Sequence, residues 1–293
     1  MKCPVCKTEV SEEHKYCFEC GAELKETARR KLTKEEAHKL LELSFAFEIN
    51  DLIDQAIQAY EAILEVNPHY ADVHFKLANA YEAGGKIGKA ISEFKKAIKI
   101  NPNYVDAHRK LGEVYSDEGL LDEAIEEFQK VLSIKVQHRY ADVHNNLGVA
   151  YERKGELDKA IESYGKAIEI NPKYAKAHFN LGNAYLAMGK IDEAINSYNR
   201  SLEIFPRQPI CLNNLGIALA TQKKFEEAKK AFESALVIDK KYVRAHHNLG
   251  NIYLDMGDEA RAAAEFAKAV ELDPKDIESQ AALEMLAESK SEG

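Results

Sequence analysis

Four of the five cysteines in the 293-residue sequence lie within its first 20 residues, as two Cys-x-x-Cys pairs. Cys3 pairs with Cys6 and Cys17 pairs with Cys20, and ten residues separate the two pairs. Two such pairs on short turns can surround one ion, and tetrahedral coordination by four thiolates is typical of structural zinc. We therefore predict one structural zinc ion at these cysteines, which folds a segment too short to fold alone.

A redox role for either pair is the alternative. The surrounding sequence lacks the strand–helix–strand pattern in which Cys-x-x-Cys dithiols work. Four sulfur ligands also leave no coordination position for water or a substrate, so we do not expect this zinc to be catalytic. The fifth cysteine, Cys211, stands alone, and we expect it to be an inert thiol on a helix.

The composition narrows the class of protein and the partners it could bind. The chain is 45% hydrophobic and 30% charged, with seven prolines and no tryptophan, which favours amphipathic helices. A net charge of -9 argues against nucleic-acid and anionic membrane surfaces, since both need concentrated Lys and Arg. No signal peptide or membrane-spanning segment is recognisable. Because the cysteines are arranged for a metal in a reducing compartment, we expect a cytoplasmic protein.

A repeated pattern organises the rest of the sequence. Segments that open at residues 37, 71, 105, 141, 175, 209 and 243 align at intervals of 34 residues, with one interval of 36 after residue 105. Counting from 1 in each segment, position 7 is always Leu, position 20 is always Ala and position 24 is always Tyr or Phe. Position 11 is aromatic in six of the seven segments. This regularity predicts seven copies of one structural unit.

The physical chemistry of each copy predicts two helices. At 100° per residue, positions 4, 7, 8 and 11 share one face of the first helix, and small residues at positions 8 and 20 let two helices approach closely. Gly at position 15, as in Gly85 and Gly119, supplies the turn between them, and Asn-Pro pairs end the second helix. One such pair cannot bury both of its faces, whereas stacked copies can.

The pattern resembles the tetratricopeptide repeat family over residues 37 to 276. The resemblance implies an all-α fold, a right-handed α-solenoid of seven helix pairs with a C-terminal capping helix. The cysteine segment is similar to microbial zinc-ribbon modules, with Gly21 after the second pair, although Lys7 follows the first pair where Gly is usual. Position 4 departs from the family, which often has Trp there. It is His in five repeats, at His74, His108, His144, His178 and His246.

We expect a structural aromatic role for these histidines. Neighbouring helices pack about 8–10 Å apart, whereas two imidazoles on one zinc ion need nitrogens within about 3.5 Å. Histidines of successive repeats therefore cannot share an ion.

The predicted organisation has four parts. Residues 1–24 form the zinc ribbon, residues 25–36 a charged linker with the start of the first helix, and residues 277–293 a capping helix and tail, with the helix at Ile277–Ala287. Thr33 and Glu36 predict a capping box at the first helix. The seven repeats span 37–70, 71–104, 105–140, 141–174, 175–208, 209–242 and 243–276.

A candidate binding face follows from positions 2, 6, 9 and 13 of each first helix, which point away from the apolar face. In tetratricopeptide arrays this face lines the concave groove. Side-chain amides at positions 6 and 9 could pair with the N–H and C=O groups of an extended peptide. The alternative is that they solvate this face and bond to the backbone locally. The predicted peptide-binding residues are Asn79, Asn146, Asn180, Asn183, Asn214, Asn248 and Asn251 with Arg244, Phe75 and Phe179.

The residues at the edge of the groove indicate less clearly which ligand would bind. Phe75 and Phe179 could take apolar side chains of a ligand, or they could simply pack against the neighbouring repeat. Asn183, Asn214 and Arg244 occupy slots that match the carboxylate clamp of co-chaperones. Phe179 and Asn248 stand where that clamp has cations, which argues against a C-terminal carboxylate as the ligand.

These features favour a non-enzymatic scaffold that binds an extended protein or peptide segment in the groove. The segment Gly84–Lys89 is not a phosphate-binding loop, because its spacing differs and Ala90 follows it. The alternative hypothesis assigns the zinc ribbon to nucleic acid or the transcription machinery, with the repeats as an assembly platform. The basic residues Arg29, Arg30 and Lys31 motivate it. End-to-end association into homo-oligomers is left open.

Overall fold

The computed structural model describes residues 2, 3, 6–10, 17, 19–21, 33–49, 52–134 and 140–291. Its regular structure in these residues is fifteen α-helices, together with one isolated antiparallel bridge between Lys2 and Glu9. The predicted all-α fold of successive helix pairs is thereby confirmed. The helices belong to two compact units, Met1–Gln137 and His138–Gly293, a division that the repeat pattern did not predict. None of the described helices has the length and apolar composition of a membrane span.

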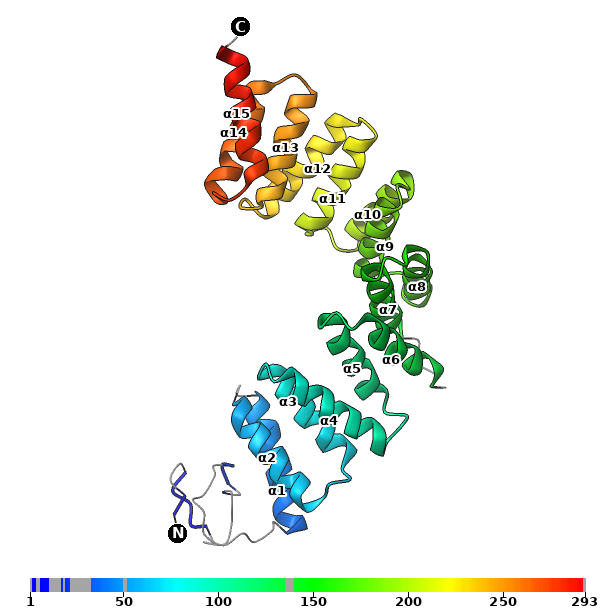
Figure 1. The fold of residues 1–293 in the computed structure, drawn as a ribbon, viewed down its shortest axis with the longest axis vertical. Coiled ribbons are helices and arrows are strands. Elements are labelled where there is room, and N and C mark those ends of the chain that lie inside the picture. Colours follow the sequence, from blue (N-terminus) through cyan, green and yellow to red (C-terminus); the bar gives the residue numbers. More distant parts are fainter. Residues whose placement is uncertain are drawn as a thin grey trace. The chain divides into compact units, whose positions relative to one another are not determined.

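The first unit contains three helix pairs (Figure 1). Each first helix packs on the second helix of its own pair, and α2 and α4 also pack on the next first helix. The predicted capping box is present, because the Thr33 N–H donates to Glu36 Oε2 at 2.7 Å and the Glu36 N–H donates to Thr33 Oγ1 at 3.2 Å. The helices are α1 (Lys34–Ile49), α2 (Ile53–Val66), α3 (Ala71–Ala83), α4 (Ile87–Ile100), α5 (Val105–Asp117) and α6 (Leu121–Ser133).

The second unit contains four helix pairs and a last helix, α15, which packs on α14 (Figure 1). α15 continues four residues beyond the predicted end at Ala287, because no Gly or Pro interrupts the chain before Gly293. The helices are α7 (Ala141–Arg153), α8 (Leu157–Ile170), α9 (Ala175–Ala187), α10 (Ile191–Ile204), α11 (Pro209–Thr221), α12 (Phe225–Ile238), α13 (Val243–Asp255), α14 (Glu259–Leu272) and α15 (Ile277–Ser291).

Within a pair, the helices are held by an aromatic ring against a small residue. The rings at position 24 are buried in all seven pairs, for example Tyr164 in α8. Gly148 at position 8 of α7 lies directly under that ring, and an added Cβ would be 2.5 Å from its Cε1 atom. The Tyr164 hydroxyl donates to Glu152 Oε2 at 2.5 Å. The ring therefore has little freedom to move away from the glycine.

Replacing Gly148 by Ala tests this contact, with Gly165→Ala as the matched control. Gly165 lies in the exposed part of α8 and has nothing within 4 Å of its Cβ position. We expect Gly165→Ala to raise the free energy of unfolding by about 0.5–1 kcal/mol through helix propensity. Gly148→Ala should lower it by about 1–2 kcal/mol through overpacking. Urea unfolding followed by circular dichroism measures both, and equal stabilisation by the two variants would contradict the packing account.

Four of the five position-4 histidines, for which we predicted a structural aromatic role, form hydrogen bonds through their ring nitrogens. Nδ1 of His108 lies 2.5 Å from Oε2 of Glu127 in α6, and its Nε2 lies 3.0 Å from the Pro102 carbonyl oxygen. His74 and His246 repeat this arrangement with Glu93 and Glu265. In each case both ring nitrogens lie within hydrogen-bond distance of an oxygen atom, and an imidazole can donate through both nitrogens only when it is protonated.

In the buried pair His108–Glu127 the shifts of both pKa values favour the charged forms. Burial alone would lower the pKa of His108, but its hydrogen bonds to Glu127 and to the Pro102 carbonyl raise that pKa above its ordinary value. Burial opposes ionisation of Glu127 as well, and its bonds to His108 and Lys130 nevertheless lower its pKa. His144 is the contrast, because position 23 of its repeat is Ser163, its Nδ1 has no hydrogen-bond partner and burial lowers its pKa.

Replacing His108 by Gln should therefore destabilise the chain in a pH-dependent way. The raised His108 pKa contributes stability that is complete below about pH 6.5 and is lost as pH rises through that pKa. The lowered Glu127 pKa contributes stability that is present above about pH 4.3 and is lost on acidification. The loss should be about 2 kcal/mol near pH 5.5 and smaller at pH 9. Chemical unfolding across this range measures it, with exposed His69→Gln as control; a pH-independent loss would refute the charged pair.

Candidate metal centre and binding face

The two cysteine pairs form the same backbone turn. The Lys7 N–H donates to the Cys3 carbonyl at 3.1 Å, and the Gly21 N–H donates to the Cys17 carbonyl at 2.7 Å. Lys7 and Gly21 both have left-handed backbone conformations, with φ of 64° and 70°. Lys7 therefore takes the conformation for which glycine is usual, and its departure from the zinc-ribbon pattern leaves the turn intact.

The sulfur atoms lie close enough to share one ion. The four Sγ atoms are all within 4.8 Å of one another, with 3.4 Å between Cys3 and Cys20 and 3.5 Å between Cys6 and Cys17. Zinc–sulfur bonds of about 2.3 Å in a tetrahedron place sulfurs about 3.8 Å apart. None of the four cysteines is joined in a disulfide, so the described residues fit a single metal ion held by four thiolates.

The electrostatics of the cluster also fit a cation. Hydrogen bonds to the Thr8 side chain and backbone lower the pKa of Cys6 to about 6. Burial raises the pKa of Cys17 to about 12, because a thiolate is poorly stabilised away from water. A divalent ion would supply the positive charge that four adjacent thiolates require.

The strained turn at Lys7 gives a test of the module. A left-handed conformation costs a non-glycine residue about 1 kcal/mol, so Lys7→Gly should strengthen zinc binding about fivefold. Competition with a chromophoric chelator on the full chain measures the affinity. Lys2→Gly, in the extended part of the module, is the control and should weaken binding or leave it unchanged. An equal or weaker affinity for Lys7→Gly would contradict the assigned turn.

A hollow of about 670 Å³ lies in the second unit, at the register predicted for the binding face. Three predicted residues line it: Asn214 in α11, with Arg244 and Asn248 in α13. The turn before α15 adds two carboxylates and a lysine to the lining, and the first turn of α15 adds a third carboxylate. The remaining lining residues are Asn213, Ile217, Val243, His247, Asp273, Lys275, Asp276, Ile277 and Glu278.

The predicted amides also connect successive repeats. Nδ2 of Asn248 donates to Oδ1 of Asn213 at 2.9 Å, and Nδ2 of Asn214 donates to Oδ1 of Asn183 at 3.0 Å. Nδ2 of Asn180 in the same way donates to Oδ1 of buried Asn145 at 3.0 Å. The side-chain nitrogens of Asn180, Asn214 and Asn248 therefore already donate at repeat interfaces, whereas we had expected both the nitrogen and the oxygen of each amide to contact a peptide.

Sequence reasoning missed the acceptors Asn145 and Asn213. Both occupy position 5 and are buried, whereas Phe179 and His247 hold position 5 in the alternate repeats. The Asn-Asn dipeptides at 145–146 and 213–214 were the available signal. Two adjacent amides on one helix cannot both face solvent in the same direction, because successive residues lie 100° apart.

The other predicted residues are placed as follows. Phe75 packs against the rings of Phe94 and Tyr104, with centroids 5.7 and 5.2 Å away, and Phe179 packs against Tyr198 at 6.1 Å. Asn251 in α13 is exposed and bonds to His247 Nε2 at 3.0 Å. Asn146 is half-buried in α7 and Asn79 lies in α3 of the first unit. Peptide binding by these residues stays a prediction.

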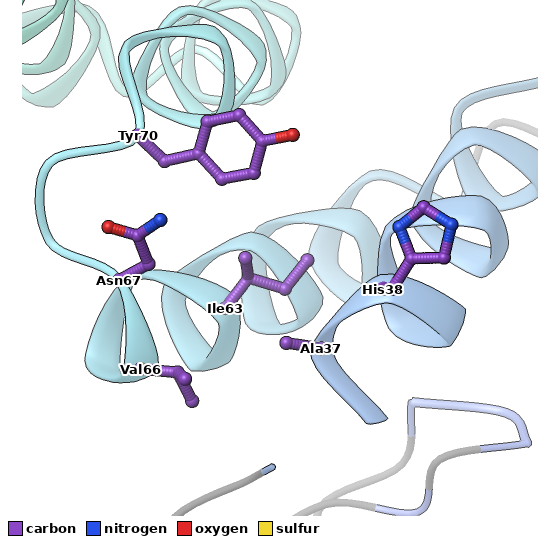
Figure 2. A pocket seen from close by; sticks show the side chains of 6 residues that line it. All are labelled: Ala37, His38, Ile63, Val66, Asn67 and Tyr70. Atoms are coloured by element: carbon purple, nitrogen blue, oxygen red, sulfur yellow. The ribbon is translucent and has the colours of Figure 1, made fainter. Parts of the chain in front are cut away.

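A second hollow, of about 410 Å³, lies in the first unit between α1 and the end of α2 (Figure 2). His38 projects from α1, and Asn67 and Tyr70 lie on the segment that joins α2 to α3. The sequence analysis had not predicted this hollow. Ala37, Ile63 and Val66 complete its lining.

The basic cluster Arg29, Arg30 and Lys31, which motivated the nucleic-acid hypothesis, lies outside the described residues.

Sequence profiles of the tetratricopeptide repeat match residues 83–119, 106–138, 153–189, 175–208 and 219–286. The chain belongs to the tetratricopeptide repeat family. A comparison with curated proteins finds no match.

Solved tetratricopeptide structures share the fold. A repeat protein from Cytophaga hutchinsonii is 19% identical with a TM-score of 0.66, covering 83% of this chain and 98% of that chain. YrrB, described as a TPR protein with an unusual peptide-binding site, is 23% identical with a TM-score of 0.55, covering 66% and 98%. A chain of the APC/C hetero-tetramer Cut9–Hcn1 is 16% identical with a TM-score of 0.62, covering 86% of this chain but only 52% of its own length.

Proposed function

We propose that this tetratricopeptide repeat protein is a non-enzymatic cytoplasmic scaffold that binds an extended segment of a partner protein. The observation that carries the proposal is the 670 Å³ hollow on α11 and α13, which lies at the face where the repeats present Asn214, Arg244 and Asn248. Family membership supports a protein-binding role, and YrrB is a relative whose own description names a peptide-binding site. The four-cysteine module contributes one structural zinc ion.

The hydrogen bonds between the amides of successive repeats indicate which amide atoms remain to contact a partner. Because Nδ2 of Asn248 donates to Asn213, its amide plane is fixed and its Oδ1 remains the atom to accept an N–H from a bound main chain. An acceptor held in place loses little freedom on binding. Each such contact is worth about 1 kcal/mol, so several repeats or a side-chain anchor must add to it.

Ile217 is the candidate anchor contact. It lies at position 9 of α11, lines the hollow together with Asn214 and Asn248 and is 36% exposed. Arg244 and Lys275 face the same hollow as Asp273, Asp276 and Glu278. We infer that the preferred segment carries an apolar side chain for Ile217, flanked by charges of both signs.

Replacing Ile217 by Asp tests the proposed face, because a carboxylate there would repel an apolar anchor. Val237→Asp is the matched control, since Val237 lies on α12, is 79% exposed and is not part of the hollow. With partners captured from the native host and identified by mass spectrometry, Ile217→Asp should reduce recovery at least tenfold, equivalent to about 1.4 kcal/mol. Val237→Asp should retain them. Equal recovery with both variants would reject this face as the binding site.

Replacing Asn180 or Asn214 by Ala is a less specific test of the proposed binding face. Asn180 and Asn214 donate across repeat interfaces, so their removal also loosens the array. A loss of binding in such variants requires a parallel measurement of unfolding before it is assigned to the face.

A further inference from the structure

The first helix of a repeat array has one face with no preceding repeat to cover it. In the internal repeats of the first unit, the aromatic residue at position 11 contacts the second helix of the preceding pair. The Tyr81 hydroxyl of α3 donates to Glu61 of α2, and the Lys95 ammonium of α4 lies 5.6 Å from the ring centroid of Tyr115 in α5. α1 carries Phe47 at this position. Residues 1–36, which come before it, contain no copy of the repeat, yet Phe47 is only 8% exposed.

The cysteine module supplies the contact that a preceding helix would otherwise make. The backbone of Gly21 lies against the Phe47 ring, so that an added Cβ would be 2.7 Å from Cε2 and 3.0 Å from Cζ. Gly21 directly follows Cys20, and its N–H bonds to the Cys17 carbonyl. The residue that touches α1 is therefore part of the second metal-binding turn.

The residue at position 11 of the first repeat is of a type that suits contact with the backbone of Gly21. Five of the other repeats have Tyr there, and the hydroxyl of Tyr81 reaches a carboxylate on the preceding helix. The first repeat has Phe, which has no hydroxyl to satisfy. The apolar ring of Phe47 can be buried against the Gly21 backbone without leaving a side-chain hydroxyl that lacks a hydrogen-bond partner.

The module has almost no interior of its own without a metal. Its described buried core consists of Cys3, Cys17 and Val10, with Cys20 packed beside them. Three of these four residues are proposed ligands. Such a segment holds its shape through the metal–sulfur bonds and not through apolar packing.

We propose that the four-cysteine module is the N-terminal cap of the repeat array, and that bound zinc controls how firmly α1 is folded. The metal fixes the turn at Gly21, which covers Phe47 in place of a preceding second helix. Loss of the metal uncovers Phe47 and loosens α1. Because α1 also provides Ala37 and His38 to the hollow in Figure 2, metal occupancy sets whether that hollow is formed. This inference rests on the proposed zinc site.

Hydrogen exchange on the full chain tests the cap, with cobalt(II) as the probe of the metal site. The wild type should bind one cobalt ion with a tetrathiolate absorption spectrum. Removal of the metal with a chelator should speed amide exchange in α1 at least tenfold. Exchange in α9 to α12, which belong to the other unit, should not change and serves as the internal control.

Two variants separate the cap from the metal site. Phe47→Ala leaves the four thiols in place, so it should bind one cobalt ion with an unchanged spectrum, while α1 exchanges rapidly with or without metal. Cys20→Ser keeps Phe47 but should lose the tetrathiolate spectrum and exchange as rapidly as the metal-free wild type. Cys211→Ser, which changes a buried cysteine of the second unit, is the matched control and should behave as wild type.

The outcomes are distinguishable. Failure of the wild type to bind cobalt with four thiolates would overturn the zinc site itself. Cobalt binding without any metal-dependent change in α1 exchange would overturn the cap and leave the zinc site standing.

Discussion

A two-helix repeat can bury only one of its faces within itself, and the rest of this structure depends on that constraint. Inside each repeat the aromatic ring at position 24 closes over a small residue at position 8, as Tyr164 does over Gly148. The outer faces are covered only when another repeat follows. Stability is therefore distributed over the contacts between neighbouring repeats, and the outer faces of the first and last repeats must be covered by other segments. At the C-terminal end α15 packs on α14, and at the N-terminal end Gly21 lies on Phe47.

Polar contacts supplement the apolar ones in a regular way. The pairs His74–Glu93, His108–Glu127 and His246–Glu265 join the first helix of a repeat to its second. Hydrogen bonds between side-chain amides, such as the one from Asn248 to Asn213, join the first helices of successive repeats. A buried polar bond is costly to leave half made. These contacts therefore favour one relative position of the helices over sliding alternatives that apolar packing alone would tolerate.

Most of the fold was predictable because it follows from local periodicity. Six first helices begin at the first residue of an aligned repeat, and the Thr33–Glu36 capping box formed as expected. The four cysteines come together because their spacing permits only short turns. The sequence pattern could not predict contacts between residues that are far apart in the sequence and that are not repeated in every copy. The bond from Asn180 to Asn145 and the contact of Gly21 with Phe47 depend on three-dimensional stacking, which a register of positions does not encode. The division into two units lies at the 36-residue interval, whose meaning the period alone did not reveal.

The place of the proposed cap before the repeats bears on how the protein is made. A chain emerges from the ribosome with its N-terminus first, so the cysteine turns are synthesised before α1 and the helix pairs that follow it. Under the proposed zinc site, α1 then meets a turn that the metal already orders. Later repeats can be added one after another on that base, each completed helix pair serving as the template for the next.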